Sequence, residues 1–552
     1  MQTEHRAELL LPAGSLEKLK IAFTYGADAV YMGTPDLSLR SKSELTLEDV
    51  VEGIEFAHSI NKKVYLTLNM YSHNKDIARL PEYIDAIKKV SPDGVLIADP
   101  GVFRMMQERA PEIPIHISTQ ANICSYETVN FWQALGAKLC VLAREVTFNE
   151  MKEIREKCPD IKIEAFVHGT MCMTYSGRCL LSNFLVERGA NQGSCANSCR
   201  WNYKVHVRLK DGTVKELEIN DDNRELFEFY LEEEYRPGEF MEITEDEKGS
   251  YIMNSKDLCL MPKLNEYLGI GVDVLKIEGR GKSPYYVATT AREYRRAVDD
   301  YYASPDTWNY KKYMTGLRSV GNHGFTLAFH DGRLKNYGHN YEDTTILSNW
   351  DFAGIVKENP EGYKDDAFYV EIKNKLEEGD VVEFMSPVTG ENMLLRVYDF
   401  DVVGKDDNVK VVHGGMKPLV RIPFSLFNNE SVEDLKKNYP PYTVLRRERA
   451  LMDEEIKRIE LDIAASEAEL ADVININTTP EEREIEKEYR EKLSELKEAI
   501  KNSTKERYTG SPRFGVEGCC GRGCNGCMVF WHDDAYEKAR EILKTKKIGE
   551  ML

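Results

Sequence analysis

The sequence predicts an α/β protein in which a TIM-like (β/α)8 barrel is followed by a small all-β domain, a helical hairpin and a cysteine-rich tail. Three observations predict this order. The first 280 residues alternate short β-rich runs with amphipathic helical stretches. Residues 350–424 then change to short strands between turn signals, and residues 447–506 repeat apolar side chains at helical spacing.

Eight strand–helix units are expected in the barrel region, which we place at residues 1–345. Eight is the number of units that closes a TIM barrel, and an open doubly wound sheet is the alternative. The expected helices include residues 15–25, 46–60, 80–90 and 128–135. The expected strands are residues 8–11, 28–32, 64–68, 94–98, 115–118, 139–142, 163–168 and 274–277.

The connection between the seventh and eighth strands, residues 169–273, is unusually long. It contains five of the twelve cysteines, four of them between residues 172 and 199, and an acidic stretch at residues 215–247. Loops that follow barrel strands lie on the C-terminal face, where barrel enzymes carry their chemistry. We therefore expect this insert to hold the cofactor site.

The later segments are assigned from their patterns. Residues 346–425 contain strand-like runs such as AFYVEIKN and GDVVEFMSP, which indicate a small β-barrel or sandwich. Residues 440–508 indicate an antiparallel helical hairpin, whose second arm begins at the Thr479-Pro480-Glu481-Glu482 capping box. The hairpin is expected to act as a strut, or as a contact to a second copy of the chain or to a protein partner. Residues 509–552 form the tail.

The composition limits the class of protein. The formal net charge is −20, which argues against a general binder of polyanions but leaves room for a local basic groove. No run approaches the roughly 20 apolar residues of a membrane span. The N-terminal residues MQTEHRAELLLPAG do not resemble a signal peptide, so we expect a cytoplasmic protein.

The cysteines are clustered, and clusters in a reducing compartment usually bind metal. Cys172 and Cys179 flank one tight turn, and Cys195 and Cys199 flank a second. Zinc sites favour close CxxC pairs, whereas the gaps here contain six and three residues, which suits an iron–sulfur cluster better. From spacing alone, zinc and the absence of any metal remain alternatives.

Several segments strongly resemble peptidase family U32, historically called collagenase-like peptidases. They are ELLLPAGSLEKLKIAFTYGADAVYMG at 8–33, EAFVHGTMCMTYSGRCLLS at 164–182, SCANSCRW at 194–201, NSKDLCL at 254–260 and KIEGRGKSPYYV at 276–287. The segment around the first two cysteines is the family's signature. The resemblance extends over residues 6–425.

The resemblance implies an O2-independent hydroxylase. Understood members of the family act on the wobble uridine of tRNA, on a cytidine of ribosomal RNA or on ubiquinone precursors, and prephenate is implicated as the oxygen source of the RNA enzymes. They hold a [4Fe-4S] cluster on four cysteines. By position, Cys172, Cys179, Cys195 and Cys199 take this role here, with Cys259 in reserve. The acidic stretch, the hairpin, the tail and the segment GNHGF at 321–325 depart from the family's common pattern, which affects the substrate more than the cluster.

A second cysteine group lies in the tail. Cys520, Cys524 and Cys527 have the spacing of radical S-adenosylmethionine enzymes, but that motif follows the first strand of a barrel and this one lies near the end of the chain. We expect a second iron–sulfur cluster or a zinc knuckle, with Cys519 or His532 as fourth ligand. A tail without metal is the alternative.

Polar residues just past the barrel strands are expected to face the active site. His168 is a candidate for proton transfer beside the cluster, or for a hydrogen bond that fixes the cysteine loop. Arg144 and Arg280 are candidates to bind a carboxylate or phosphate, with an Arg280–Glu278 ion pair as the alternative. Tyr175 is expected to stack on a substrate ring or to pack under the loop, and Glu164 to be structural. The residues at the strand ends are Asn69, Asp99, Gln120, Arg144, His168, Glu278 and Arg280.

Three functions follow from these observations. The first is an iron–sulfur-dependent hydroxylase that modifies RNA, most plausibly tRNA. The second is a peptidase, although the sequence has no GxSxG elbow and no HExxH helix. The third is a non-catalytic redox or scaffold protein that docks a partner through the hairpin and the tail.

Overall fold

The computed structural model describes residues 6–33, 45–172, 174–175, 185, 255–332, 348–398, 400–404, 409–427 and 430–449, and positions 456, 459, 460, 463, 464, 466 and 467. Between residues 206 and 251 it describes the backbone of short strands. The chain divides into two compact units. The first comprises Met1–Arg280 and Pro284–Asn502, and the second comprises Gly281–Ser283 and Ser503–Leu552. Everything below concerns the first unit.

Eight parallel strands close into a barrel, which confirms the predicted TIM-like class. Neighbours in the sequence pair in order from β1 to β7, and β14 then pairs with both β7 and β1. Each predicted strand corresponds to one of these strands. Their bounds are β1 (Glu8–Ala13), β2 (Ala29–Gly33), β3 (Lys63–Leu68), β4 (Gly94–Ile97), β5 (Ile115–Ile117), β6 (Leu139–Val141), β7 (Lys162–Thr170) and β14 (Val274–Ile277).

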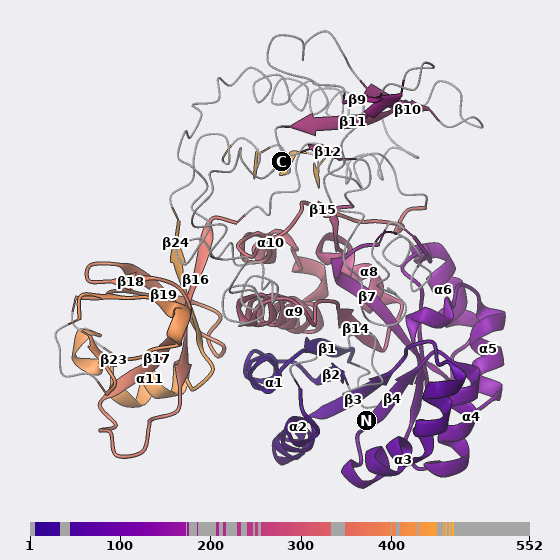
Figure 1. Cartoon of the computed structure of the whole chain (residues 1–552), viewed down its shortest axis with the longest axis horizontal. Coiled ribbons are helices and arrows are strands. Elements are labelled where there is room, and N and C mark those ends of the chain that lie inside the picture. The colour runs from indigo at the N-terminus through magenta and orange to yellow at the C-terminus, as the bar shows by residue number, and fades with distance from the viewer. Residues whose placement is uncertain are drawn as a thin grey trace. The chain divides into compact units, whose positions relative to one another are not determined.

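Helices surround the barrel, and Figure 1 shows α3, α4, α5 and α6 along the outside of the strands. Their first turns carry the expected caps: Ser15 accepts a hydrogen bond from the backbone of Lys18, and Thr46 and Thr147 form capping boxes. The helices are α1 (Leu16–Thr24), α2 (Leu47–Ser59), α3 (Asn74–Val90), α4 (Pro100–Arg109), α5 (Tyr126–Ala134), α6 (Phe148–Lys157), α8 (Leu264–Gly269), α9 (Pro284–Ala303) and α10 (Lys311–Arg318).

The long insert returns to the barrel through a strand that the sequence analysis did not predict. β13 (Asp257–Cys259) pairs antiparallel with the end of β7, and β15 (Phe325–Thr326) continues the sheet beyond it. This pairing places Cys259 opposite His168. Within the insert, the described backbone forms β8 (His206–Arg208), β9 (Val214–Glu216), β10 (Phe229–Glu232), β11 (Phe240–Asp246) and β12 (Gly249–Tyr251), which pair antiparallel.

The second domain is an antiparallel sheet in the order β20-β19-β24-β16-β17-β23-β21. Its last strand, β24, lies at Val444–Glu448, beyond the predicted end of the domain at residue 425 and inside the range predicted for the hairpin. Val444 and Leu445 are buried between β16 and β19, whereas the charged residues after them read like the start of a helix. The other bounds are β16 (Trp350–Lys357), β17 (Ala367–Ile372), β18 (Leu376–Glu377), β19 (Val381–Met385), β20 (Asn392–Arg396), β21 (Asp401–Val402), β22 (Val411–Val412), β23 (Leu419–Pro423) and α11 (Val432–Asn438).

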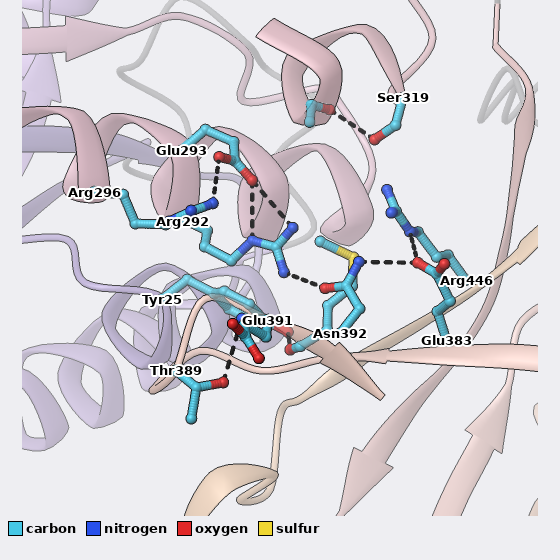
Figure 2. A network of polar contacts seen from close by, with 12 residues as sticks. Tyr25, Arg292, Glu293, Arg296, Ser319, Glu383, Thr389, Glu391, Asn392 and Arg446 are labelled. Carbon is cyan, nitrogen blue, oxygen red and sulfur yellow. Dashed lines mark hydrogen bonds and ion pairs between the residues drawn. The ribbon is translucent and has the colours of Figure 1, made fainter. Parts of the chain in front are cut away.

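The barrel and the sheet domain pack against each other through buried polar contacts. The Tyr25 hydroxyl donates to the Met385 carbonyl at 2.7 Å and accepts from the Val444 amide at 2.9 Å. Arg292 on α9 donates to the Asn392 side chain at 2.6 Å, and Asn392 in turn donates to Glu383 at 2.9 Å (Figure 2). Because these groups are paired with each other, the contact costs little desolvation energy and fixes the sheet against α9 and the end of α1.

The hydrophobic cores follow the same division. One cluster of buried side chains fills the barrel and its helices, and a second fills the sheet domain. Within the described residues, no helix is both long and apolar enough to cross a membrane.

Candidate active site

The C-terminal mouth of the barrel gathers polar and charged side chains from several strands. This is the face on which barrel enzymes bind their substrates, because the strand ends point their following loops toward one centre. The residues concerned follow or end β3, β5, β6, β7 and β14, as predicted. They are Asn69, Gln120, Arg144, His168, Glu278 and Arg280, together with Lys276 inside β14.

One side of the mouth is built from amides and hydroxyls. The Asn69 amide nitrogen donates to Ser118 Oγ at 3.0 Å and to Gln120 Oε1 at 3.1 Å. The Gln120 carbonyl accepts from the Tyr71 hydroxyl at 2.9 Å. Asn69 is 6% exposed, and its Oδ1 is buried with no hydrogen-bond partner in the described structure. A buried acceptor without a partner is costly, so this oxygen is suited to accept from a ligand.

The other side carries three cations over two aromatic rings. The Arg144 guanidinium lies 4.0 Å from the centre of the Phe166 ring. Lys276 Nζ lies 4.4 Å from the centre of the Tyr31 ring, and the Arg280 guanidinium lies 5.9 Å from it. Such cation–π contacts hold the cations without neutralising them.

A buried carboxylate on β7 pairs with one of these cations. Glu164, fully buried on β7, accepts from Lys276 Nζ at 2.5 Å, and its second oxygen has no hydrogen-bond partner among the described residues. Burial raises the pKa of Glu164 and lowers the pKa of Lys276, and the nearby Arg280 and Arg144 lower the pKa of Lys276 further. Arg144, which forms no ion pair with any described residue, adds a positive charge near this pair.

Arg280 and Arg144 differ in their surroundings. Arg280 Nη1 donates to Thr67 Oγ1 at 2.9 Å, which aims its guanidinium across the barrel toward β3. The backbone of Arg280 passes so close to Gly14 that a Cβ there would meet the Arg280 carbonyl at 2.2 Å, so Gly14 must lack a side chain. Arg144 forms no ion pair with any described residue and stays available to a ligand.

His168 lies under the mouth rather than in it, because it is 2% exposed. The rings of Tyr286, Tyr294 and Phe325 surround it at 5.5–5.9 Å. The Tyr294 hydroxyl donates to the Val167 carbonyl at 2.8 Å and lies 3.4 Å from His168 Nδ1.

A glycine fixes where the cysteine loop leaves the barrel. Gly169 has φ +121°, and a Cβ there would meet the Glu278 carbonyl at 2.6 Å. The backbone amide of Glu278 donates to the His168 carbonyl at 2.8 Å, and the Glu278 carbonyl accepts from Tyr286 at 2.7 Å. The end of β7 is thus clamped against the end of β14, and the loop that contains Cys172 starts at the mouth.

The predicted metal ligands are only partly described. Cys172 is exposed shortly after the end of β7, and Cys259 is buried. Cys179, Cys195 and Cys199 lie outside the described residues, as do Cys519, Cys520, Cys524, Cys527 and His532 of the tail. In the part of the chain that is described, no three His, Cys, Asp or Glu side chains gather as a metal site. All four predicted cluster ligands, Cys172, Cys179, Cys195 and Cys199, stay predictions.

Three further residues were named from the sequence: one caps a helix, one is exposed and one forms a buried ion pair. Asp99 accepts from the backbone of Gly101 at 2.7 Å and Val102 at 3.1 Å, so its carboxylate caps α4. Tyr175 is 62% exposed, on the loop after Cys172. Glu164, expected to be structural, instead is the only described carboxylate that pairs with Lys276.

The sequence analysis missed three residues of the barrel interior: Lys276, Tyr31 and His116. These residues lie within strands, whereas only residues just past the strand ends were expected to face the active site. His116 on β5 packs against the Tyr65 ring at 4.7 Å. Burial and the charge of Lys276 lower the pKa of His116 to about 3, so this histidine is neutral at physiological pH. Alternate residues of a strand face the same side of the sheet. This period of two places Lys276, His116 and Glu164 inside the barrel, and it would have identified Lys276 and His116.

The fold and the residues at the strand ends together define a TIM-like barrel protein with polar and charged side chains at its C-terminal mouth. The chain belongs to peptidase family U32, because the model of that family matches residues 14–340 and the model of the family's C-terminal domain matches residues 348–433.

Curated relatives extend over most of the chain. The "tRNA hydroxylation protein P" of Escherichia coli (strain K12) is 40% identical over 409 residues, which cover 71% of this chain and 88% of the relative. A protein of the same name from Haemophilus influenzae is 38% identical, with 70% and 87% covered. A "Collagenase" from Porphyromonas gingivalis is 33% identical, with 60% and 76% covered.

Proposed function

We propose that this chain is an enzyme that hydroxylates a base of tRNA, most plausibly a uridine at the wobble position. Relatives at 36–40% identity carry the name tRNA hydroxylation protein. The observation that carries the proposal is Arg144, a guanidinium at the mouth that forms no ion pair with any described residue, in a chain whose net charge is −20. A local positive field in an acidic protein favours an anionic ligand at this place.

The proposed cofactor is a [4Fe-4S] cluster on Cys172, Cys179, Cys195 and Cys199. Thiolates are the usual ligands of such clusters, and Cys172 is exposed at the point where the loop leaves the mouth. When bound, the cluster would supply electron transfer or a site for the oxygen donor. The barrel's part is to fix the position of the first ligand through the close contact of Gly169 with Glu278.

The proposed oxygen donor is a small carboxylate such as prephenate. Arg144 and Arg280 can bind a carboxylate through paired hydrogen bonds. Asn69 Oδ1, buried and without a described partner, can accept from a donor hydroxyl. The aromatic faces of Tyr31 and Phe166 bound the same space and would exclude water from one side of the ligand.

Two parts of the proposal concern segments beyond the described residues. The tail cysteines, Cys519, Cys520, Cys524 and Cys527, are proposed to hold a second iron–sulfur cluster or zinc. The hairpin is proposed to contact a protein partner or a second copy of the chain.

Peptidase activity is the second candidate, because one relative is named a collagenase. Proteolysis needs an activated nucleophile or a metal-bound water. The described mouth carries cations, amides, hydroxyls and the carboxylates of Glu164 and Glu278, and the pairing of Glu164 with Lys276 makes this carboxylate a poor general base.

The cofactor is tested by anaerobic purification of three proteins: wild type, Cys172→Ala and the control Cys124→Ala, whose half-buried thiol lies outside the cysteine loop. Visible absorption and iron and sulfide counts should show a cluster in the wild type and the control. Cys172→Ala should lose the visible absorption of the cluster at the mouth, whereas any metal bound by the tail cysteines should remain. Equal iron in all three proteins would exclude Cys172 as a ligand.

The reaction is tested with the same preparations. Undermodified tRNA should gain a hydroxylated uridine when prephenate is supplied, and a collagen peptide should stay intact. Cleavage of the peptide without change in the tRNA would favour the peptidase instead.

A further inference from the structure

A cavity lies beside β13 and β15, and Cys259 of β13 is among the residues that line it. It has a volume of about 170 Å3 and is bounded by α10, by Phe325 on β15 and by Ile463 from the segment after β24. Pockets for drug-sized ligands start at roughly 300 Å3. This cavity therefore has room for a single ring system.

The walls of the cavity are aromatic and apolar. Phe325 and Tyr310 contribute rings, and Met314 and Ile463 contribute flexible and branched side chains. Phe325 also packs edge-on against His168, with ring centres 5.5 Å apart. One ring thus separates the cavity from the histidine under the mouth, which places the cavity next to the proposed reaction centre.

The rim of the cavity carries two cations and one carboxylate. Lys311 is exposed, Arg318 lies with its guanidinium 5.5 Å from the Phe325 ring centre, and Glu467 stands opposite on the later segment. Lys311 and Lys312 occupy the first turn of α10, where no acidic residue is present. The N-terminal end of a helix carries the positive end of the helix dipole. The two lysines therefore add to a local potential that is already positive.

One wall of the cavity comes from outside the family's conserved domains. The two family models end at residue 433, whereas Ile463, Ser466 and Glu467 line the cavity from beyond that point. Ala464 is buried there, and Ser466 Oγ donates to the Phe325 carbonyl at 3.5 Å. The additional segment is therefore seated on β15 and completes the cavity.

We infer that this cavity receives one unstacked nucleotide of the RNA substrate. The base would lie against Phe325 and Tyr310, and its phosphate would lie at Lys311 and Arg318. Single-stranded RNA is bound in this way, by bases stacked on aromatic rings and phosphates held by cations. A base that undergoes chemistry must leave the stack, and unstacked neighbours need such a place. The inference rests on the proposed function, and it adds that the segment after β24 helps to select the RNA.

The charge of the rim is tested with Lys311→Ala and its matched control Lys312→Ala. Both lysines are exposed on the first turn of α10, but only Lys311 lines the cavity, and Lys312 faces Asp300 at 3.8 Å. Fluorescence anisotropy with a tRNA transcript should give a dissociation constant about fivefold higher for Lys311→Ala, and a salt slope smaller by about one. Lys312→Ala should stay within about twofold of the wild type. Equal effects of the two substitutions would overturn the inference.

The cavity itself is tested with Ile463→Trp, which fills it without changing the charge. Hydroxylation should fall at least about tenfold, while the melting temperature stays near that of the wild type. Wild-type hydroxylation by a folded Ile463→Trp protein would overturn the inference, and if this variant does not fold, the lysine pair decides. Failure of the wild type to bind any tRNA would instead refute the proposed function, so the two failures are distinguishable.

Discussion

At the scale of single residues, the mouth of the barrel depends on an imbalance of charge. Arg144 forms no ion pair in the described structure, Arg280 contacts Thr67, and Lys276 shares Glu164. A substrate carboxylate or phosphate would complete this set. Each cation therefore has a separate and testable role.

Arg144 should act in ligand binding without contributing much to stability. Arg144→Ala is expected to raise the KM for the carboxylate donor about 10- to 100-fold, because a charge-assisted hydrogen bond contributes roughly 1.5–3 kcal/mol. Steady-state hydroxylation at increasing donor concentration measures this. Arg109→Ala, a surface arginine paired with Asp85, is the control and should leave KM unchanged. An unchanged KM in Arg144→Ala would remove this residue from the site.

Lys276 and Glu164 should be coupled in stability. Lys276→Met leaves a buried carboxylate without a partner and should cost about 3–5 kcal/mol of unfolding free energy. The double variant Lys276→Met/Glu164→Leu should regain a large part of that loss, because the unpaired charge is gone. Urea unfolding of the two single variants and the double variant gives the coupling energy. Additive losses would contradict the buried pair.

His116 should make stability depend on pH. Its folded pKa is lowered to about 3, whereas an unfolded histidine titrates near 6.5. Between these values the unfolded chain binds one proton more, so the unfolding free energy should fall by about 1.4 kcal/mol per pH unit as pH drops below about 6.5. His116→Leu should reduce the slope by one proton between pH 5 and 6.5 in urea unfolding. An identical slope in both proteins would show that His116 is protonated in the fold.

At the scale of elements, the eight barrel strands could be predicted from the sequence, whereas β13 and β24 could not. Each predicted strand is apolar, short and followed by a polar residue, and local pattern alone identifies such runs. β13 has three residues and β24 is rich in arginine, so neither has a strong pattern, and both are strands because of pairing with distant segments. For the same reason the hairpin was predicted to start at residue 440, although β24 occupies Val444–Glu448.

The site was predictable where residues follow strands and not where they lie within them. Arg144 and Arg280 were found from the barrel rule alone. Lys276 was missed because the sequence around a lysine in an apolar strand does not show that it pairs with Glu164. Asp99 was expected at the mouth, whereas its carboxylate caps α4. Contacts between strands far apart in the chain decide both cases.

The contact between the barrel and the sheet domain makes its own prediction. Tyr25→Phe removes the hydroxyl that serves the Met385 carbonyl and the Val444 amide, so two buried backbone groups lose their partner. The expected loss is about 1–3 kcal/mol of unfolding free energy. Thermal or urea unfolding measures it, with Tyr363→Phe, whose side chain is 42% exposed, as a control near zero. A neutral Tyr25→Phe would mean that water replaces the hydroxyl.

At the scale of the whole molecule, the chain combines a family core with additions. The family models cover the barrel and the sheet domain up to residue 433, and the segment after β24 lies beyond them yet lines a cavity at β15. The core supplies the mouth with its polar and charged side chains, and the additions are expected to modify which RNA reaches it.

The most direct test of the account is the nucleoside content of tRNA from cells that lack the gene and are complemented with variants. Mass spectrometry should show the hydroxylated uridine lost in the deletion, restored by the wild type and by Cys124→Ala, and absent with Cys172→Ala or Arg144→Ala. An unchanged set of tRNA nucleosides in the deletion strain would contradict the assignment of this chain to tRNA hydroxylation.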